Sequence, residues 1–443
     1  MVDVDASRDG DWDAADSPSF VDVFAGCGGL SLGLKRAGWR GLFAIEKDAF
    51  AFETLSTNFP VGEGRLSYNW PKIIERRPWD IAELLEKNSE ELTHLAGTVD
   101  LLAGGPPCQG FSHAGKRRPD DPRNRLFEAY LKLVSILRPK VVLIENVRGF
   151  TTAFDIVKSN GIGNFANALR DRLAPDYHMV SAIIRADNFG VPQARARFFL
   201  IGLRRGQGRP DRVPSFFDDM IEGRDAFLAA RGFPRRPTAR DALSDLEVSY
   251  AGTKPCPECK GFDAISYRGP RSSYQVAMRE GFNEPPGDTR LARHRSDIRD
   301  RFAAIIQSSN EDGRLNVNIS RELRRAHGLN KVAIRVMDPF SPSPTITSLP
   351  DDLLHYAEPR TLTVRENARL QSFPDWFSFR GKYTTGGERR ALEVPRFTQV
   401  ANAVPPLLAE QIGLCLRGLL GLERSDMFSE GSADLPERIL LRA

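Results

Sequence analysis

The chain has 443 residues, 41% of them hydrophobic, which is enough to bury a substantial core and too many for a single small binding module. Its net charge is +4, but the first 16 residues contribute −5, so the remainder carries +9 and favours a polyanionic partner. Five cysteines are too few for a disulfide framework, and no apolar run approaches the roughly 18 to 20 residues of a membrane span. Together these features predict a cytoplasmic protein with no membrane partner.

Short apolar runs alternate with helix-like segments after an acidic stretch, residues 1–17, that is predicted to be a disordered tail. The runs are apolar throughout, as in the strands of a parallel sheet covered on both faces. Predicted helices are 30–37 and 126–137, and predicted strands are 20–24, 41–45, 99–103, 141–144, 179–186 and 197–203, the last two paired through a turn at 188–190. This order predicts an α/β fold with a doubly wound, mostly parallel sheet.

The amino-acid composition of the sequence changes after Arg204. Arg, Gly and Pro are frequent from there to about Pro344, with Arg clusters at 290–301 and 321–325, whereas clean helical periodicity returns at 363–371 and 405–419. The expected organisation is a main domain built from 18–203 and 345–423, a smaller inserted domain at 204–344, and a C-terminal tail at 424–443.

A glycine-rich turn follows the first predicted strand. Phe24, Gly26, Gly28 and Gly29 stand between a strand and a helix, where glycines let the backbone pass close to a ligand. Glu46 ends the next strand, where a carboxylate can accept both hydroxyls of a ribose. No Gly-x-Gly-x-x-Gly pattern leads into this helix, so the residues indicate an adenosine-type ligand other than NAD. The alternative to ligand binding is that the glycines only form a tight turn and that Glu46 is an ordinary solvated carboxylate.

The most specific segment is 104–112, directly after the strand 99–103. Pro107 and the proline before it stiffen a loop that presents Cys108, followed by Gln109 and Ser112. A lone cysteine is usually a small buried hydrophobe, but this setting favours a presented thiol at the edge of the sheet where α/β enzymes hold their ligands.

Three charged residues are expected near that thiol. Glu145 ends the neighbouring strand on the same edge of the sheet, and Arg195 and Arg197 alternate along an extended segment, so that they project to one face. The alternative interpretations are that Glu145 only caps the following turn and that the two arginines lie on a solvated strand face.

In this order the motifs resemble those of the DNA (cytosine-5) methyltransferase family, over residues 20–202 and about 342–411. The resemblance implies a Rossmann-like fold that binds S-adenosylmethionine and a target-recognition domain at 204–344. Segments 360–374 and 399–406 resemble the family's ninth and tenth motifs, a structural helix that supports the recognition region and a return to the cofactor pocket. The implied cofactor-binding residues are Phe24, Gly26, Gly28, Gly29, Glu46, Asp80, Asn402 and Val404.

The resemblance also implies a mechanism. Cys108 would add to ring carbon 6 of a flipped cytosine, and Glu145 would share a proton with ring nitrogen 3. Arg197, with Arg195 beside it, would hold the ring carbonyl. Transfer of the methyl group to carbon 5 would require no metal. The implied substrate loop contains Pro107, Gln109 and Ser112.

The implied partner is double-stranded DNA, acted on by a monomer associated with the nucleoid at a short specific sequence. A modification or defence system is the expected context, in which a cognate restriction endonuclease would be a second partner. An RNA cytosine methyltransferase is one alternative, although the continuation 110–112 favours DNA. A non-catalytic DNA-binding regulator on the same scaffold is another, and the intact Cys108, Glu145 and Arg197 argue against it.

Cys256 and Cys259 have the spacing of a zinc knuckle, and His294 is a conceivable third ligand. Four ligands are normally required for structural zinc, so a plain loop is the favoured interpretation.

Overall fold

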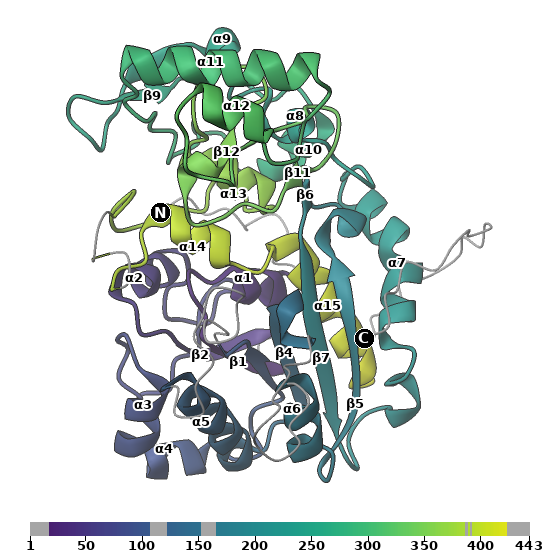
Figure 1. Ribbon diagram of the computed structural model, residues 1–443. Coiled ribbons are helices and arrows are strands. Elements are labelled where there is room, and N and C mark those ends of the chain that lie inside the picture. The colour runs from purple at the N-terminus through teal and green to yellow at the C-terminus, as the bar shows by residue number, and fades with distance from the viewer. Residues whose placement is uncertain (1–16, 107–121, 152–164, 386–388, 390–391, 423–443) are drawn as a thin grey trace.

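The computed structural model describes residues 17–106, 122–151, 165–385, 389 and 392–422. A larger lower part contains the main sheet, and a smaller upper part is formed largely by the segment between β7 and α13 (Figure 1). Apart from Ser17, the predicted tails at 1–17 and 424–443 lie outside the described residues.

The main sheet has six strands in the order β2-β1-β3-β4-β7-β5. The first four are parallel, and β7 runs antiparallel to both of its neighbours. The first four strands and β7 are largely buried because helices cover both faces, which explains their apolar runs, whereas the edge strand β5 is only half buried. Their bounds are β1 (Ser19–Val23), β2 (Arg40–Ile45), β3 (Leu101–Gly104), β4 (Val141–Val147), β5 (Tyr177–Arg185) and β7 (Ala196–Arg204).

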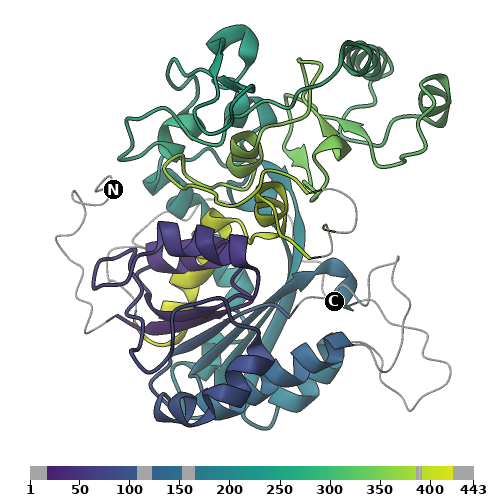
Figure 2. The same ribbon diagram turned by 90° about the vertical axis from the view of Figure 1, so that its left-hand side faces the viewer.

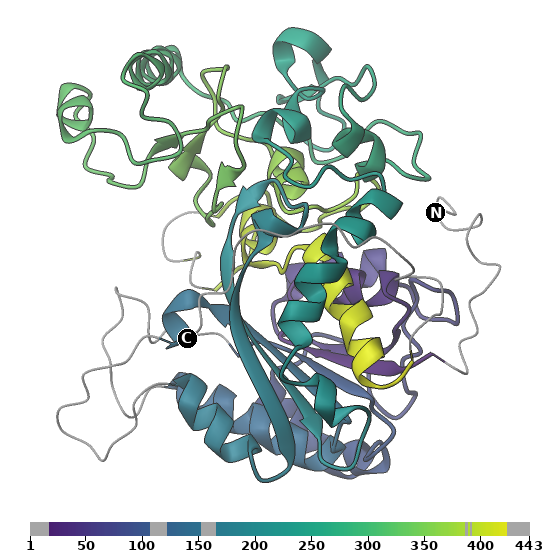
Figure 3. The same cartoon turned by 90° about the vertical axis from the view of Figure 1, so that its right-hand side faces the viewer.

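Two groups of helices lie on opposite faces of this sheet (Figures 1 and 3). One group is α1 (Gly29–Arg36), α7 (Phe216–Ala230) and α15 (Pro406–Leu419); the other is α3 (Ile81–Lys87), α4 (Ser89–His94), α5 (Pro122–Leu137) and α6 (Phe165–Leu173). Near the upper part, α2 (Ala49–Asn58) contacts α14 (Arg396–Asn402). The predicted doubly wound, mostly parallel fold is confirmed.

The main domain combines segments from both ends of the described chain. Helices α1 and α15 pack so closely that a Cβ at Gly33 would lie 2.4 Å from the Cβ of Ala409. The indole Nε1 of Trp39 donates to the carbonyl oxygen of Gly413 at 2.8 Å. The return of the chain after the insertion therefore completes the core that the first segment began.

The upper part is divided into two lobes, which Figure 2 shows side by side. One lobe has a small core that includes Ile305, Ile319 and Val336, and the other a core of Leu246, Ala251 and Ile265. The elements of the upper part are α8 (Ala239–Leu243), α9 (Val248–Ala251), β8 (Thr253–Pro255), β9 (Asp263–Ile265), α10 (Ser273–Met278), α11 (Ser296–Glu311), α12 (Arg321–Ala326), β10 (Arg335–Val336) and β12 (Leu353–Leu354). Helix α13 (Val364–Leu370) of the returning chain contacts α8 on one side and α14 on the other.

A short parallel pair ties the segment just before β7 to the end of the insertion: β6 (Gln193–Ala194) bonds to β11 (Ser343–Pro344). Helix α7 falls within 204–344 but packs on α15, and its Met220 and Leu228 belong to the main core. Arg231 Nε at its end donates to Glu410 Oε1 at 2.7 Å. By packing, the upper part therefore begins after α7. Four short 3-10 helices complete the described chain: η2 (Arg148–Thr151), η3 (Ala186–Phe189), η4 (Pro210–Arg212) and η5 (Pro350–Asp352).

Candidate active site

A pocket of about 300 Å³ opens at the carboxyl edge of β1, β2, β3 and β4. The chain passes from β1 outward to β2 and then returns to β3 on the other side of β1, which makes this edge the topological switch point where α/β folds bind ligands. Nine of the residues predicted for catalysis or cofactor binding line this pocket: Phe24, Gly26, Glu46, Asp80, Glu145, Arg195, Arg197, Asn402 and Val404.

The end of β3 has no room for side chains. A Cβ on Gly104 would lie 2.0 Å from the carbonyl oxygen of Val23, and one on Gly105 would lie 2.0 Å from that of Glu145. Gly104 also has φ of 149°, a region that favours glycine. The two glycines therefore let the chain leave the sheet between β1 and β4, directly beside the Glu145 carboxylate.

Glu145, Arg195 and Arg197 form a charged cluster inside the pocket. Arg197 Nε lies 3.1 Å from Glu145 Oε1, and the side chains of Arg197 and Glu145 are 14% and 16% exposed. Arg195 is more deeply enclosed, with an exposure of 2%. Burial raises the pKa of Glu145, while the charges of Arg197 and Arg195 oppose that rise. Within the described part of the chain, Nε and Nη1 of Arg195 have no hydrogen-bond partner. The cluster thus offers donors that are already desolvated.

Glu46 organises the opposite end of the pocket. Its Oε2 accepts from the amide of Gly26 at 2.9 Å, and its Oε1 accepts from the amide of Asp48 at 2.8 Å. Gly26 has φ of 57°, and a Cβ there would meet no atom within 4 Å. The carboxylate therefore holds the glycine turn against the end of β2 and faces open space.

The remaining predicted cofactor residues take different positions. Asp80 caps α3, where its Oδ1 accepts from the amide of Ala82 at 2.9 Å, and it also lines the pocket. Gly28 and Gly29, in contrast, do not line the described part of the pocket. A Cβ on Gly28 would strike the ring of Phe59, and one on Gly29 would lie 2.4 Å from the carbonyl oxygen of Val404. These two glycines permit close packing behind the pocket wall.

Sequence reasoning missed Asp22, a fully buried carboxylate that lines the pocket from the middle of β1. It accepts a hydrogen bond from Ser31 Oγ, which lies 2.6 Å from the hydroxyl of Tyr68. Burial raises the pKa of Asp22 to about 7, and the nearby charge of Glu46 adds to that rise. An acid inside an otherwise apolar strand was the available signal.

Asn146 was also missed. Its Nδ2 donates to the carbonyl oxygen of Pro106 at 3.0 Å, and its Oδ1 accepts from the amide of Val147 at 2.8 Å. This side chain ties the end of β4 to the start of the loop after β3. The predicted Pro107, Cys108, Gln109 and Ser112 lie outside the described residues.

The two cysteines with zinc-knuckle spacing lie in the loop between β8 and β9. Among the residues that the structure describes, no group of three or more His, Cys, Asp or Glu side chains could hold a metal. His294 instead accepts from the amide of Thr361 at 3.4 Å and packs edge-on against Phe302.

Comparison with known proteins decides the family. The family model of C-5 cytosine-specific DNA methylases matches residues 19–416. The chain belongs to this family. It is 34% identical over 409 residues to the Type II methyltransferase M.DdeI of Desulfomicrobium norvegicum, covering 89% of this chain and 87% of that protein. It is 30% identical over 420 residues to M.XorII of Xanthomonas oryzae pv. oryzae, covering 89% and 84%.

A solved structure, described as a candidate DNA modification methyltransferase encoded within an E. coli prophage, shares the fold. It covers 91% of this chain and 100% of its own, with a TM-score of 0.60 and 24% identity. The predicted family, fold and DNA cytosine-5 methyltransferase activity are confirmed, and the RNA-modifying and non-catalytic alternatives are not favoured. Membership implies S-adenosylmethionine as methyl donor. Over the ranges described, no helix has the length and hydropathy of a membrane span.

The buried Asp22 predicts a pH-dependent stability. The carboxyl ionises near 3.8 in the unfolded chain but near 7 in the folded methylase, so between these values the folded state binds the extra proton. The contribution of Asp22 to the free energy of unfolding should therefore fall by about 4 kcal/mol as the pH rises from 4 to 7. Asp22→Asn should remove this loss, so that its stability relative to wild type increases across that range.

Urea unfolding of both proteins at several pH values measures the difference. Val21→Ala in the same strand removes buried packing without changing a titratable group, so it is the control and should give a curve parallel to wild type. Parallel curves for Asp22→Asn as well would show that Asp22 ionises normally.

Proposed function

We propose that this methylase flips a target cytosine into the described pocket and methylates carbon 5 with Cys108 as nucleophile. The observation that carries this proposal is the convergence of Glu145, Arg195 and Arg197 on the pocket that also contains Gly26 and Glu46. The loop with Cys108 leaves the sheet at this pocket, after Pro106. A base inside a stacked duplex cannot reach such a site, so the cytosine must leave the helix.

The residues of the chain activate the ring in defined steps. The Cys108 thiolate forms a bond to carbon 6, and the displaced electron pair moves toward ring nitrogen 3, where Glu145 supplies a proton. Carbon 5 thereby becomes nucleophilic enough to take the methyl group. Loss of the carbon 5 proton and departure of Cys108 then restore the aromatic ring. Arg197, with Arg195 beside it, holds the ring carbonyl.

The pocket fits S-adenosylmethionine, which when bound supplies the methyl group as an electrophilic sulfonium. Glu46 lies where it can accept the ribose hydroxyls, and the open space at Gly26 lets the ligand approach the backbone. Phe24, Asp80, Asn402 and Val404 line the same wall and would hold the rest of the cofactor. We propose that Gly28 and Gly29 shape that wall, because the absence of side chains lets Phe59 and Val404 pack closely behind it.

Glu145 is suited to proton transfer because two effects on its pKa oppose each other. Burial favours the protonated carboxyl, and the neighbouring Arg197 favours the carboxylate. A group poised between the two forms can deliver a proton to ring nitrogen 3 and later recover it.

Replacement of Cys108 by Ala should abolish methyl transfer, because it removes the thiolate that adds covalently to carbon 6. Binding of S-adenosylmethionine and of DNA should persist. Transfer of a radiolabelled methyl group to DNA and, separately, to RNA is the measurement. Cys415→Ala on α15 is the control and should stay active. Turnover by Cys108→Ala above a few per cent of wild type would remove this residue from the role.

Exchange of Glu145 for Gln should slow transfer by roughly a hundredfold or more, because an amide can hydrogen-bond the ring but cannot supply a proton. Single-turnover kinetics isolate the chemical step. Glu128→Gln changes an exposed partner of Arg172 in the same way and should leave the rate unchanged. An unaltered single-turnover rate for Glu145→Gln would mean that another group protonates the ring.

Site selection is assigned to the insertion at 204–344, the target-recognition region, and most directly to the upper part after α7. Its exposed cations support contact with phosphates: Arg293, Arg295 and Arg299 lie on or before α11, and Arg321 and Arg325 lie on α12. Arg290 has a different place, because its guanidinium stacks between Phe262 and Tyr383.

The biological setting is part of the same proposal. The relatives are named as Type II methyltransferases, which supports modification of a short specific sequence in a modification or defence system. A cognate restriction endonuclease would then be the second partner. We place the enzyme in the cytoplasm at the nucleoid, acting as a monomer on double-stranded DNA.

Exchange of residues 232–344 for the corresponding segment of M.DdeI should transfer methylation to the site of that relative, because the exchanged segment carries the base-reading side chains. Bisulfite sequencing of methylated plasmid DNA identifies the cytosine. A second chimera that exchanges only α7 should retain the original site. A folded, active first chimera that keeps the original site would contradict the assignment.

A further inference from the structure

Two thiols lie against each other in the loop between β8 and β9. A hydrogen bond links the thiol of Cys259 to that of Cys256. Both cysteines are free and half-buried, so a small reagent can reach them. Two backbone bonds close the loop: the amide of Cys256 donates to the carbonyl oxygen of Phe262 at 2.8 Å, and the amide of Phe262 donates to that of Cys259 at 3.2 Å. The turn therefore holds the two sulfur atoms within reach of each other.

This pair of thiols is better suited to oxidation than to metal binding. Structural zinc normally takes four ligands, and in the part of the chain that the structure describes no third His, Cys, Asp or Glu completes a site with the pair. Two adjacent thiols can instead be joined as a disulfide. In cytosolic proteins such disulfides are usually transient and redox-sensing, which fits the cytoplasmic location proposed above.

The two sulfur atoms differ in how readily they react. Burial raises the pKa of Cys259, and the hydrogen bond with Cys256 adds to that rise, whereas the charge of Arg290 opposes it. The proton between the two sulfur atoms therefore stays with Cys259. Because the thiolate is the nucleophile in thiol chemistry, Cys256 is the sulfur that attacks first.

The segment between the two cysteines connects them to the cofactor pocket. Glu258 Oε2 accepts from Arg396 Nη1 at 2.7 Å and from the hydroxyl of Tyr383 at 3.3 Å. Arg396 is the first residue of α14, and Gln399 and Asn402 of the same helix line the pocket. A disulfide would enclose Glu258 in a small ring, so a change in the turn would reach Arg396 and the pocket wall.

We propose that Cys256 and Cys259 form a modification site, a dithiol that low-molecular-weight disulfides oxidise reversibly and that acts on the cofactor pocket through Glu258. The Cys256 thiolate attacks one sulfur of the small disulfide, which gives a mixed disulfide and releases one thiol. Cys259 then loses its proton and attacks the sulfur of Cys256, which closes the internal bond and releases the second thiol. Two electrons and two protons thus pass to the small disulfide. The link to the pocket rests on the proposed cofactor site.

Oxidised glutathione is the probe for the dithiol, applied to full-length Cys108→Ala so that the proposed nucleophile cannot react. Of the five cysteines, four remain in this variant. After oxidation, alkylation of the denatured chain should find two thiols, and dithiothreitol should restore all four. Peptide mapping should place the new bond between Cys256 and Cys259. Cys27 and Cys415 should stay reduced, because burial raises the pKa of each to about 12.

The affinity for S-adenosylmethionine is the second readout, measured by calorimetry on the reduced and the oxidised chain. Oxidation should weaken binding by about fivefold or more, because the displaced turn shifts Arg396 and α14. Glu258→Gln should form the same disulfide but bind the cofactor equally in both redox states, since it lacks the charge that holds Arg396. The matched control is Glu284→Gln, which changes an exposed acid of the insertion and should keep the full response.

Four results would overturn the inference, and each has its own meaning. Four thiols after oxidation, or mixed disulfides alone, would show that the pair does not close. One zinc ion per reduced chain, lost in Cys256→Ser, would show a metal site instead. A disulfide that leaves the affinity unchanged would show that Glu258 transmits nothing to the pocket. A reduced chain that binds no S-adenosylmethionine would refute the proposed cofactor site itself, whatever the thiol count.

Discussion

The site depends on the close approach of three strand ends at one edge of the sheet. Gly104 and Gly105 follow β3 at points where a single carbon atom would collide with the backbones of β1 and β4. Only a chain without side chains can leave the sheet there, and it emerges against Glu145. The distance between the loop after β3 and the acid of β4 is therefore set by backbone packing in the core. Catalytic geometry of this kind does not rely on flexible side chains.

That rigidity allows the pocket to enclose charge. Asp22, Glu46, Glu145 and two arginines lie in one small volume, where removal of water shifts the pKa of each described acid upward. The shifts differ because the neighbours differ: Glu46 is bound by two backbone amides, whereas Glu145 faces two guanidinium groups. Similar carboxyl groups thereby acquire different properties from their surroundings: Glu46 is a fixed hydrogen-bond acceptor, and Glu145 is the proposed proton donor.

Much of this arrangement could be predicted from the sequence because it is encoded locally. Unbroken apolar runs located the strands, and the residues that follow them fell on the predicted edge, which brought Glu46, Glu145 and Arg197 into one pocket. Long-range packing could not be predicted in this way. Nothing local shows that α7 packs on α15, or that the two-residue strands β6 and β11 pair across 150 residues of sequence. Asp22 was overlooked because its hydroxyl partner, Ser31, lies on the following helix.

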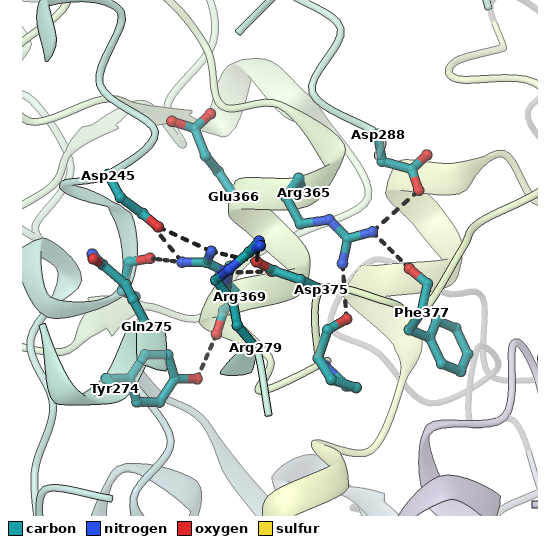
Figure 4. A network of polar contacts seen from close by, with 12 residues as sticks. Asp245, Tyr274, Gln275, Arg279, Asp288, Arg365, Glu366, Arg369, Asp375 and Phe377 are labelled. Atoms are coloured by element: carbon teal, nitrogen blue, oxygen red, sulfur yellow. Dashed lines mark hydrogen bonds and ion pairs between the residues drawn. The ribbon is translucent and has the colours of Figure 1, made fainter. Parts of the chain in front are cut away.

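Buried ion pairs of Arg369 with Asp245 and Asp375 join the upper part to the returning chain (Figure 4). Apolar packing crosses the same contact, because Ala239, Leu243 and Met278 of the upper part belong to the main core, while each lobe also has a minor core of its own. An apolar interface also requires matching shapes over its whole area, whereas an ion pair requires only the right charge and direction at a few positions. Under the recognition role proposed for the insertion, its outer surface can therefore differ from one DNA target to another while acids such as Asp245 and Asp288 keep their contacts with the arginines of α13.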